Sequence, residues 1–211
     1  MKIASRMKTK MRDKLARSHH LTRGFTLIEL MIVVVIMGVL ASLATYSVSN
    51  YIQKSKMTEA REVVGQIMSA QEAYFDEVGA YMDVTGTASA DSGYYPNGTF
   101  DGQTRIQWGG ADSCATGGET CMLRFRRLGV FVNQPVMFRY ASTTLATGAN
   151  PQTKMPSSYV TSSAFNPGSV VAPRPGYVVV GLSDLNGDSA KRSAVVGTSL
   201  QAQLYIENPG E

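Results

Sequence analysis

A long apolar run dominates the first quarter of the chain. Residues 25–48 carry one charged side chain, Glu29, and residues 30–44 carry none. At 1.5 Å per residue, a helix over residues 25–48 is about 36 Å long, which is enough to cross a hydrocarbon core of about 30 Å. The run therefore predicts a transmembrane helix.

The helical pattern continues beyond this run but becomes amphipathic. Between residues 53 and 81 apolar side chains recur at steps of three and four residues, with Gln71 as the one polar exception, and charged residues fill the other face. No proline interrupts residues 25–81. We therefore expect one helix of about 55 residues, transmembrane over residues 25–52 and amphipathic over residues 53–82. Its second half needs a globular partner along one stripe.

Residues 83–211 show the pattern of a sheet interrupted by loops, and we expect them to form a globular head. Residues 83–122 are rich in Gly, Ser, Thr and Asp and predict a loop. Residues 121–207 predict a sheet, with a second loop over residues 142–176; the expected strands are 121–130, 135–141, 177–182, 193–197 and 200–207. The predicted fold class is α+β, with the long N-terminal helix packed on a C-terminal antiparallel sheet of four or five strands.

Positive charge is concentrated ahead of the apolar run. Residues 1–24 contain eight Lys or Arg side chains and one acid. Basic flanks stay on the cytoplasmic side of a membrane, which places residues 83–211 on the outer side.

The junction between the basic segment and the apolar run reads RGFTLIEL, residues 23–30. This string resembles the cleavage and methylation motif of type IV prepilins. The resemblance extends strongly over residues 23–55; beyond the helix it covers only the order of the elements. It implies that residues 1–24 are a leader peptide, and that a prepilin peptidase cuts between Gly24 and Phe25 and N-methylates Phe25.

Glu29 is unusual because a carboxylate in a membrane segment is costly unless it is paired, neutral or close to the interface. One interpretation is that Glu29 simply lies at the membrane edge. The resemblance implies another, in which Glu29 pairs with the N-terminal amine of a neighbouring subunit in a filament. Misplaced subunits would then leave one desolvated charge unpaired.

An ordinary secretory signal peptide is the competing interpretation of this region. Its apolar core would span residues 30–43, with cleavage after Ala41 or Ala44. However, Glu29 interrupts the start of such a core, and the helical pattern continues past the expected cut. We therefore favour cleavage before the apolar run.

Removal of residues 1–24 changes the formal net charge from +4 to −3. The basic isoelectric point then belongs to the precursor, so we expect no nucleic-acid partner. Catalysis is not indicated either, since residues 25–211 contain no His, no thiol–base pair and no phosphate-binding glycine loop that ends in Lys-Ser or Lys-Thr. We expect a protein that is not an enzyme.

Two cysteines, Cys114 and Cys121, are present. On the outer side of a membrane they can oxidise, and their bond would close a short ring that contains glycine. On the chain-entropy model such a disulfide stabilises the fold by about 2–3 kcal/mol. A zinc site is not expected, since both histidines lie in the leader.

A short acidic turn provides one candidate metal site. Asp184, Asn186 and Asp188 place oxygen ligands at alternate positions around Gly187, which is the chemistry of a short calcium loop. The alternative is a hairpin turn whose side chains cap their own backbone. We favour the turn because three ligands fall short of the six or more oxygens that calcium takes, and we expect no other cofactor.

The resemblance implies a major or minor pilin, the structural subunit of a type IV pilus-like filament. Such a subunit is a single-pass protein of the inner membrane, with its N-terminus in the cytoplasm, until it enters an extracellular pilus. The implied partners are further copies or other pilins, prepilin peptidase, the pilus assembly machinery and inner-membrane lipid. Two alternatives remain: a type II secretion pseudopilin, and a membrane-anchored or secreted binding module.

Overall fold

The computed structural model describes residues 24–86, 88, 93–99, 101–109, 115–116, 118–156, 171–187 and 192–208. The chain divides into two compact units, residues 1–44 and 45–211. The boundary between them lies inside the long helix α1 (Leu27–Val78).

Helix α1 confirms the long helix expected from the apolar and amphipathic patterns. It ends at Val78 because Gly79 takes up a left-handed conformation, with φ of 77°, and its N–H donates to the carbonyl oxygen of Phe75 at 2.7 Å. A glycine in this conformation is a common stop after the last helical residue. In the second unit the helix buries a stripe at helical spacing: Met57, Ala60, Val63, Val64 and Ile67.

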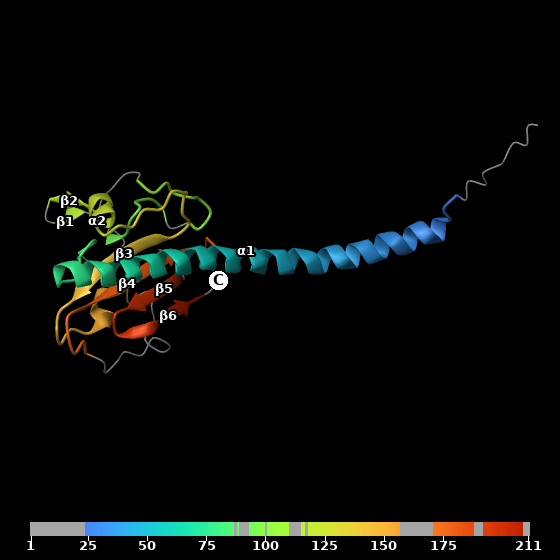
Figure 1. Ribbon diagram of the computed structural model, residues 1–211. Coiled ribbons are helices and arrows are strands. Elements are labelled where there is room, and N and C mark those ends of the chain that lie inside the picture. The colour runs from blue at the N-terminus through green and yellow to red at the C-terminus, as the bar shows by residue number, and fades with distance from the viewer. Residues whose placement is uncertain are drawn as a thin grey trace, which may run out of the picture. The chain divides into compact units, whose positions relative to one another are not determined.

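The described residues of the second unit contain a four-stranded antiparallel sheet (Figure 1). Consecutive strands are neighbours, in the order β3-β4-β5-β6. Their bounds are β3 (Arg139–Leu145), β4 (Gly176–Ser183), β5 (Ser193–Thr198) and β6 (Gln201–Glu207). The last three lie close to the predicted strands, whereas β3 starts four residues later than the predicted 135–141 and extends into the predicted second loop.

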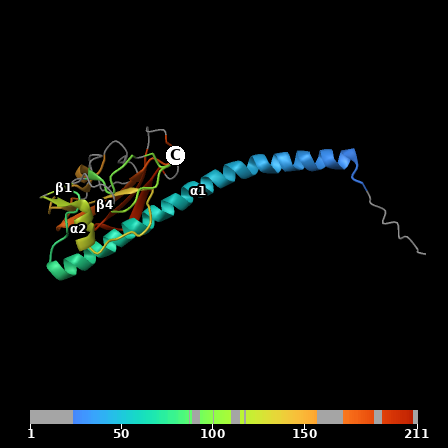
Figure 2. The same cartoon turned by 90° about the horizontal axis from the view of Figure 1, so that it is seen from above.

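Both faces of the sheet are covered. Figures 1 and 2 show the second half of α1, which belongs to the same unit as the sheet, running along one face. On that face Tyr140, Val179 and Val195 share a hydrophobic cluster with the buried stripe of α1. On the other face Val180 and Val196 belong to a second cluster, whose remaining members come partly from irregular segments: Ala88, Tyr94, Met155 and Ala172. Because both faces are buried, the central strands read as apolar runs rather than as strict alternation.

Two glycines allow α1 to lie close to the sheet. A Cβ on Gly181 would lie 3.1 Å from the ring of Tyr140 and 3.3 Å from a methyl group of Val64. A Cβ on Gly197 would lie 2.3 Å from the sulfur of Met68. Larger residues at these positions would have to push the helix or its side chains away from the strands.

The prediction of a strand over residues 121–130 is wrong. These residues form helix α2 (Cys121–Arg127), which follows a short two-stranded sheet of β1 (Ala115–Thr116) and β2 (Glu119–Thr120). Thr120 caps the helix by accepting a hydrogen bond from the Leu123 N–H. In α2 and its C-cap the buried residues are Cys121, Phe125 and Leu128, at steps of four and three. This helical spacing, in a segment of good helix formers, outweighs the apparent alternation of Leu123 and Phe125.

The main sheet therefore begins at Arg139 rather than within residues 121–130. Residues 130–138 form no helix and no strand of the sheet, although Val136 makes an isolated antiparallel bridge to Ile106. A short 3-10 helix, η2 (Pro151–Lys154), lies in the segment between β3 and β4.

Candidate processing and assembly site

The expected cleavage junction, Gly24–Phe25, lies immediately before the helix. Residues 24–26 have no regular secondary structure, and α1 begins at Leu27. Phe25 is 84 % exposed, and a Cβ on Gly24 would meet no atom of the described residues within 4 Å. The junction is therefore open to another protein on the side that the structure describes. A cut there leaves the whole of α1 on the C-terminal product.

Thr26 and Glu29 form a reciprocal cap on the first turn of α1. The N–H and the hydroxyl of Thr26 donate to Glu29 Oε2 at 3.0 and 2.8 Å, and the Glu29 N–H donates to Thr26 Oγ1 at 3.2 Å. The carbonyl oxygen of Thr26 accepts the first helical hydrogen bond, from the N–H of Leu30, at 3.3 Å. This is the capping-box arrangement, in which two donors at a helix N-terminus are satisfied by side chains. Both residues lie on the C-terminal side of the expected cut.

The first part of α1 exposes apolar side chains on all sides. Ile28, Leu30, Val34 and Leu40 are each more than half exposed, and none of the most apolar window of the helix is buried. By length and composition this is one helix able to cross a membrane. A helix that is apolar all round needs lipid or other helices around it.

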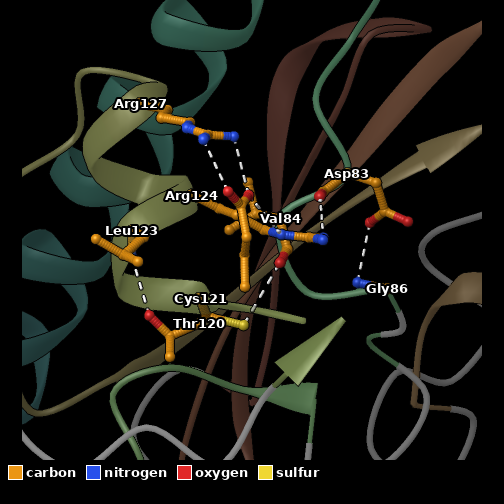
Figure 3. Close-up of polar contacts among 9 residues, drawn as sticks. Asp83, Val84, Gly86, Thr120, Cys121, Leu123, Arg124 and Arg127 are labelled. Carbon is orange, nitrogen blue, oxygen red and sulfur yellow. Dashed lines mark hydrogen bonds and ion pairs between the residues drawn. The ribbon is translucent and has the colours of Figure 1, made fainter. Parts of the chain in front are cut away.

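Cys121, one of the two cysteines, is fully buried at the start of α2. The sulfur of Cys121 lies 3.4 Å from the carbonyl oxygen of Val84, so the start of α2 packs against the segment after α1 (Figure 3). Cys114 lies outside the described residues. The Cys114–Cys121 disulfide therefore stays a prediction.

Two of the three arginines of α2, Arg124 and Arg127, make contacts within the local fold. Glu119 pairs with Arg127 at 2.7 Å and lies 3.9 Å from Arg124. Arg124 also donates to the carbonyl oxygen of Asp83 at 2.8 Å, as Figure 3 shows. Arg139, which is close to them in sequence, is buried in β3. These contacts give no support for a nucleic-acid interface.

The acidic turn has the geometry of a backbone cap where it is described. Asp184 is buried, and its Oδ1 accepts a hydrogen bond from the Gly187 N–H at 2.8 Å, with Gly187 at a φ of 77°. Asn186 lies in the same turn, and Asp188 lies outside the described residues. The described residues contain no group of three or more acidic, His or Cys side chains placed to hold a metal ion. Calcium binding at this turn stays a prediction.

Comparison with known proteins gives a family match in the N-terminal segment. Residues 20–45 match the family model described as the prokaryotic N-terminal methylation motif. The chain carries a prokaryotic N-terminal methylation motif. The resemblance inferred from residues 23–30 is thereby confirmed, and the matched residues include the expected cut, the cap and most of the apolar helix.

Curated relatives of this pilin-like chain are fimbrial proteins. It is 40 % identical over 70 residues to the type IV major pilin protein PilA of Myxococcus xanthus, and 37 % identical over 78 residues to the fimbrial protein EcpC of Eikenella corrodens. A probable minor fimbrial protein of Dichelobacter nodosus is 49 % identical over 49 residues. The matches cover 33, 36 and 23 % of this chain and 32, 51 and 31 % of the respective relatives. No solved structure gives a significant match.

Within this motif, the prediction from the sequence named Glu29 as a functional residue but did not name Thr26. The structure brings the two side chains together, so the motif contains a cap as well as a charge. The signal was present, because Thr-x-x-Glu ahead of an apolar run is the sequence signature of a capping box.

Proposed function

We propose that this chain is the structural subunit of a type IV pilus-like filament, and that it is cut between Gly24 and Phe25 by a prepilin peptidase that then methylates Phe25. The matched methylation motif over residues 20–45, which leads directly into an exposed apolar helix, carries this proposal. The names of the curated relatives support it, since they include major and minor fimbrial proteins. A structural role of this kind requires no catalytic site.

Before assembly, the subunit waits in the inner membrane. The apolar part of α1 crosses the lipid once, with the basic segment of residues 1–24 in the cytoplasm and residues 53–211 on the outer side. The assembly machinery then transfers the helix from lipid to a bundle of like helices. This transfer is tolerable because both surroundings are apolar, so the apolar side chains remain out of water.

In the filament, Glu29 pairs with the new N-terminal amine of Phe25 in a neighbouring subunit. The cap contributes to this role, because both hydrogen bonds from Thr26 end on Oε2 of Glu29. Among the described residues Oε1 has no donor, so it is available to the ammonium group. A carboxylate that keeps its cap while it accepts the amine is oriented before the partner arrives, which reduces the entropic cost of pairing.

Mass spectrometry of the N-terminus tests the proposal. Surface filaments are sheared from cells and their subunit is analysed; the expected first residue is N-methylated Phe25. In a Gly24→Val variant the leader should remain attached and filaments should be lost. A matched Gly38→Val variant should be cut normally, since Gly38 also has open space around it but lies inside the helix. Ser42 or Thr45 as the first residue would instead identify a secretory signal peptide and overturn the proposal.

A further inference from the structure

A cavity of about 430 Å³ lies at the C-terminal end of α1. Its volume falls in the range of small-molecule sites, roughly 300–1,000 Å³. Side chains and backbone from three places line it: the end of α1 and the turn after it, the end of β3, and the segment that leads into β4. All of these segments belong to the second unit of the chain.

One wall of the cavity is a pair of aromatic rings. Because Gly79 reverses the chain after α1, Tyr81 folds back onto the last turns of the helix. Its ring stacks on that of Phe75, with centroids 4.5 Å apart and an interplanar angle of 24°. Tyr177 meets the ring of Tyr81 edge-on at 4.9 Å. These contacts hold the Tyr81 ring in place, so the wall is ordered before any ligand binds.

The rest of the lining is mainly apolar and includes one charge. Leu145 and Pro175 add apolar surface, and the charged lining residue is Arg174, which is exposed. No acidic side chain among the described residues forms an ion pair with this guanidinium. Burial and the Glu72 carboxylate raise the pKa of Tyr81, whereas Arg174 acts in the opposite direction, which places the cation near the aromatic wall.

We propose that this cavity binds a small aromatic carboxylate, with its ring against Phe75 and Tyr81 and its carboxylate on Arg174. A guanidinium presents paired donors that match the two oxygens of a carboxylate. An aromatic ring suits the stacked wall, because offset-stacked and edge-to-face rings attract each other beyond the area that they bury. A sugar acid fits less well, since the polar lining side chains are few: Thr144, Tyr81 and Arg174.

The test uses the full chain in detergent micelles and follows alanine methyl groups by NMR. Ala80 and Ala146 line the cavity and report on its occupancy. On titration with benzoate we expect saturable shifts of these two methyls. Benzyl alcohol, which has the ring without the charge, and glucuronate, which has the charge without an aromatic ring, should each bind at least about tenfold more weakly.

Two variants test whether Arg174 contacts the carboxylate of the ligand. Arg174→Gln should weaken benzoate binding about tenfold or more, since it removes a charge-assisted pair of hydrogen bonds. Arg126→Gln is the matched control, because Arg126 is also an exposed arginine but lies beside Phe131 at a different cavity; it should leave the affinity unchanged. The same micelles are present throughout, so partitioning of the probe into detergent cancels in the comparison.

The opposite results would overturn the proposal. Equal affinity for benzoate in the wild type and Arg174→Gln would remove the assigned role of the guanidinium. Stronger binding of glucuronate than of benzoate would overturn the aromatic assignment. The absence of any saturable shift at Ala80 and Ala146 would exclude the site itself.

Discussion

The side chain of Gln71 donates a hydrogen bond from Nε2 to Ser142 Oγ at 2.8 Å, between α1 and β3. The same side-chain amide forms two hydrogen bonds with the backbone of Met82. Its Nε2 donates to the Met82 carbonyl oxygen at 2.7 Å, and its Oε1 accepts from the Met82 N–H at 3.0 Å. Gln71 is fully buried. The one polar exception in the apolar stripe of the helix therefore joins the helix, the turn after it and the sheet.

Replacing Gln71 by Leu should destabilise the second unit by about 2–4 kcal/mol. The change leaves the buried Ser142 hydroxyl and both partly buried backbone groups of Met82 without their hydrogen-bond partner. Urea unfolding of the full chain in detergent, followed by circular dichroism, measures the effect. Gln66→Leu is the control: Gln66 is exposed on the same helix, and its replacement should cost less than about 0.5 kcal/mol. Equal effects at the two positions would contradict the assigned role of Gln71.

Glu59 makes two contacts, and substitutions can test which of them stabilises the fold. Its Oε2 pairs with Arg105 at 3.0 Å, but the Arg105 side chain is 54 % exposed. Its Oε1 accepts from the N–H of Met137, a buried residue, at 2.7 Å. Arg105→Ala should cost less than about 1 kcal/mol, as exposed ion pairs do. Glu59→Ala should cost about 1–3 kcal/mol, because it leaves the Met137 N–H without an acceptor.

Glu59→Gln separates these contacts further. The amide oxygen can still accept from Met137, so this variant should behave like Arg105→Ala in the same urea experiment. If Glu59→Gln is instead as unstable as Glu59→Ala, the charge rather than the hydrogen bond is the stabilising element.

The long helix and three of the four strands of the main sheet could be predicted because each has a clear signal. A continuous apolar run and a stripe at helical spacing have few other interpretations. The error over residues 121–130 has a physical cause: in so short a segment, alternation and helical spacing both fit some of the apolar positions. The helical spacing of Cys121, Phe125 and Leu128 outweighs the alternation, and the cap at Thr120, which lies outside the apolar pattern, adds to it.

The candidate site was predictable to the extent that it is local in sequence. Gly24, Phe25 and Glu29 lie within six residues, so a linear motif contains them. The cavity beside Phe75, Tyr81 and Arg174 could not be predicted, because it depends on how the end of α1 is placed against β3 and β4. Nothing in the sequence around Arg174 indicates that an aromatic pair nearly a hundred residues earlier lies beside it.

Two glycines should respond in opposite ways to the same substitution. Gly102 has a φ of 56°, and a Cβ there would lie 1.7 Å from the backbone carbonyl oxygen of Asp184. Gly102→Ala should therefore destabilise the fold by about 2–4 kcal/mol, from backbone strain and overpacking together. Gly65 lies inside α1 with open space around its Cα, so Gly65→Ala should stabilise by about 0.5–1 kcal/mol. Thermal unfolding of both variants checks the two signs.

We predict that the stability of the fold depends on pH in the acidic range because of the Asp101 carboxyl group. Hydrogen bonds from Thr104, first from its backbone N–H, and from Gln103 and Thr99 lower the pKa of Asp101 from 3.8 to about 2. Because the carboxylate is favoured in the folded state, its contribution is present above about pH 4 and is lost as the pH falls from about 4 to about 2.

An NMR titration of the Asp101 carboxyl carbon measures this directly, and its midpoint should lie well below 3.8. The stability difference between the wild type and Asp101→Asn should shrink over the same range. A midpoint near the ordinary value would show that these hydrogen bonds do not persist in solution.

The cap between Thr26 and Glu29 makes it possible to separate the charge of Glu29 from its part in starting the helix. A capping box accepts Gln in place of Glu, so Glu29→Gln should keep the first turn of α1 and lose only the charge. Thr26→Val keeps the charge and the β-branched shape but removes the hydroxyl that caps the Glu29 N–H. If Glu29 pairs with a neighbouring amine, Glu29→Gln should block assembly and Thr26→Val should largely spare it.

The measurement is the ratio of subunit in sheared filaments to subunit in the membrane, determined by immunoblotting, with helix content checked by circular dichroism. Normal filaments from Glu29→Gln would exclude charge pairing. Equal defects in the two variants would assign the requirement to the cap. A defect in Glu29→Gln alone, at wild-type helix content, would show that the carboxylate acts between subunits. The helix would then still be intact, so loss of the cap within α1 could not be the cause of the assembly defect.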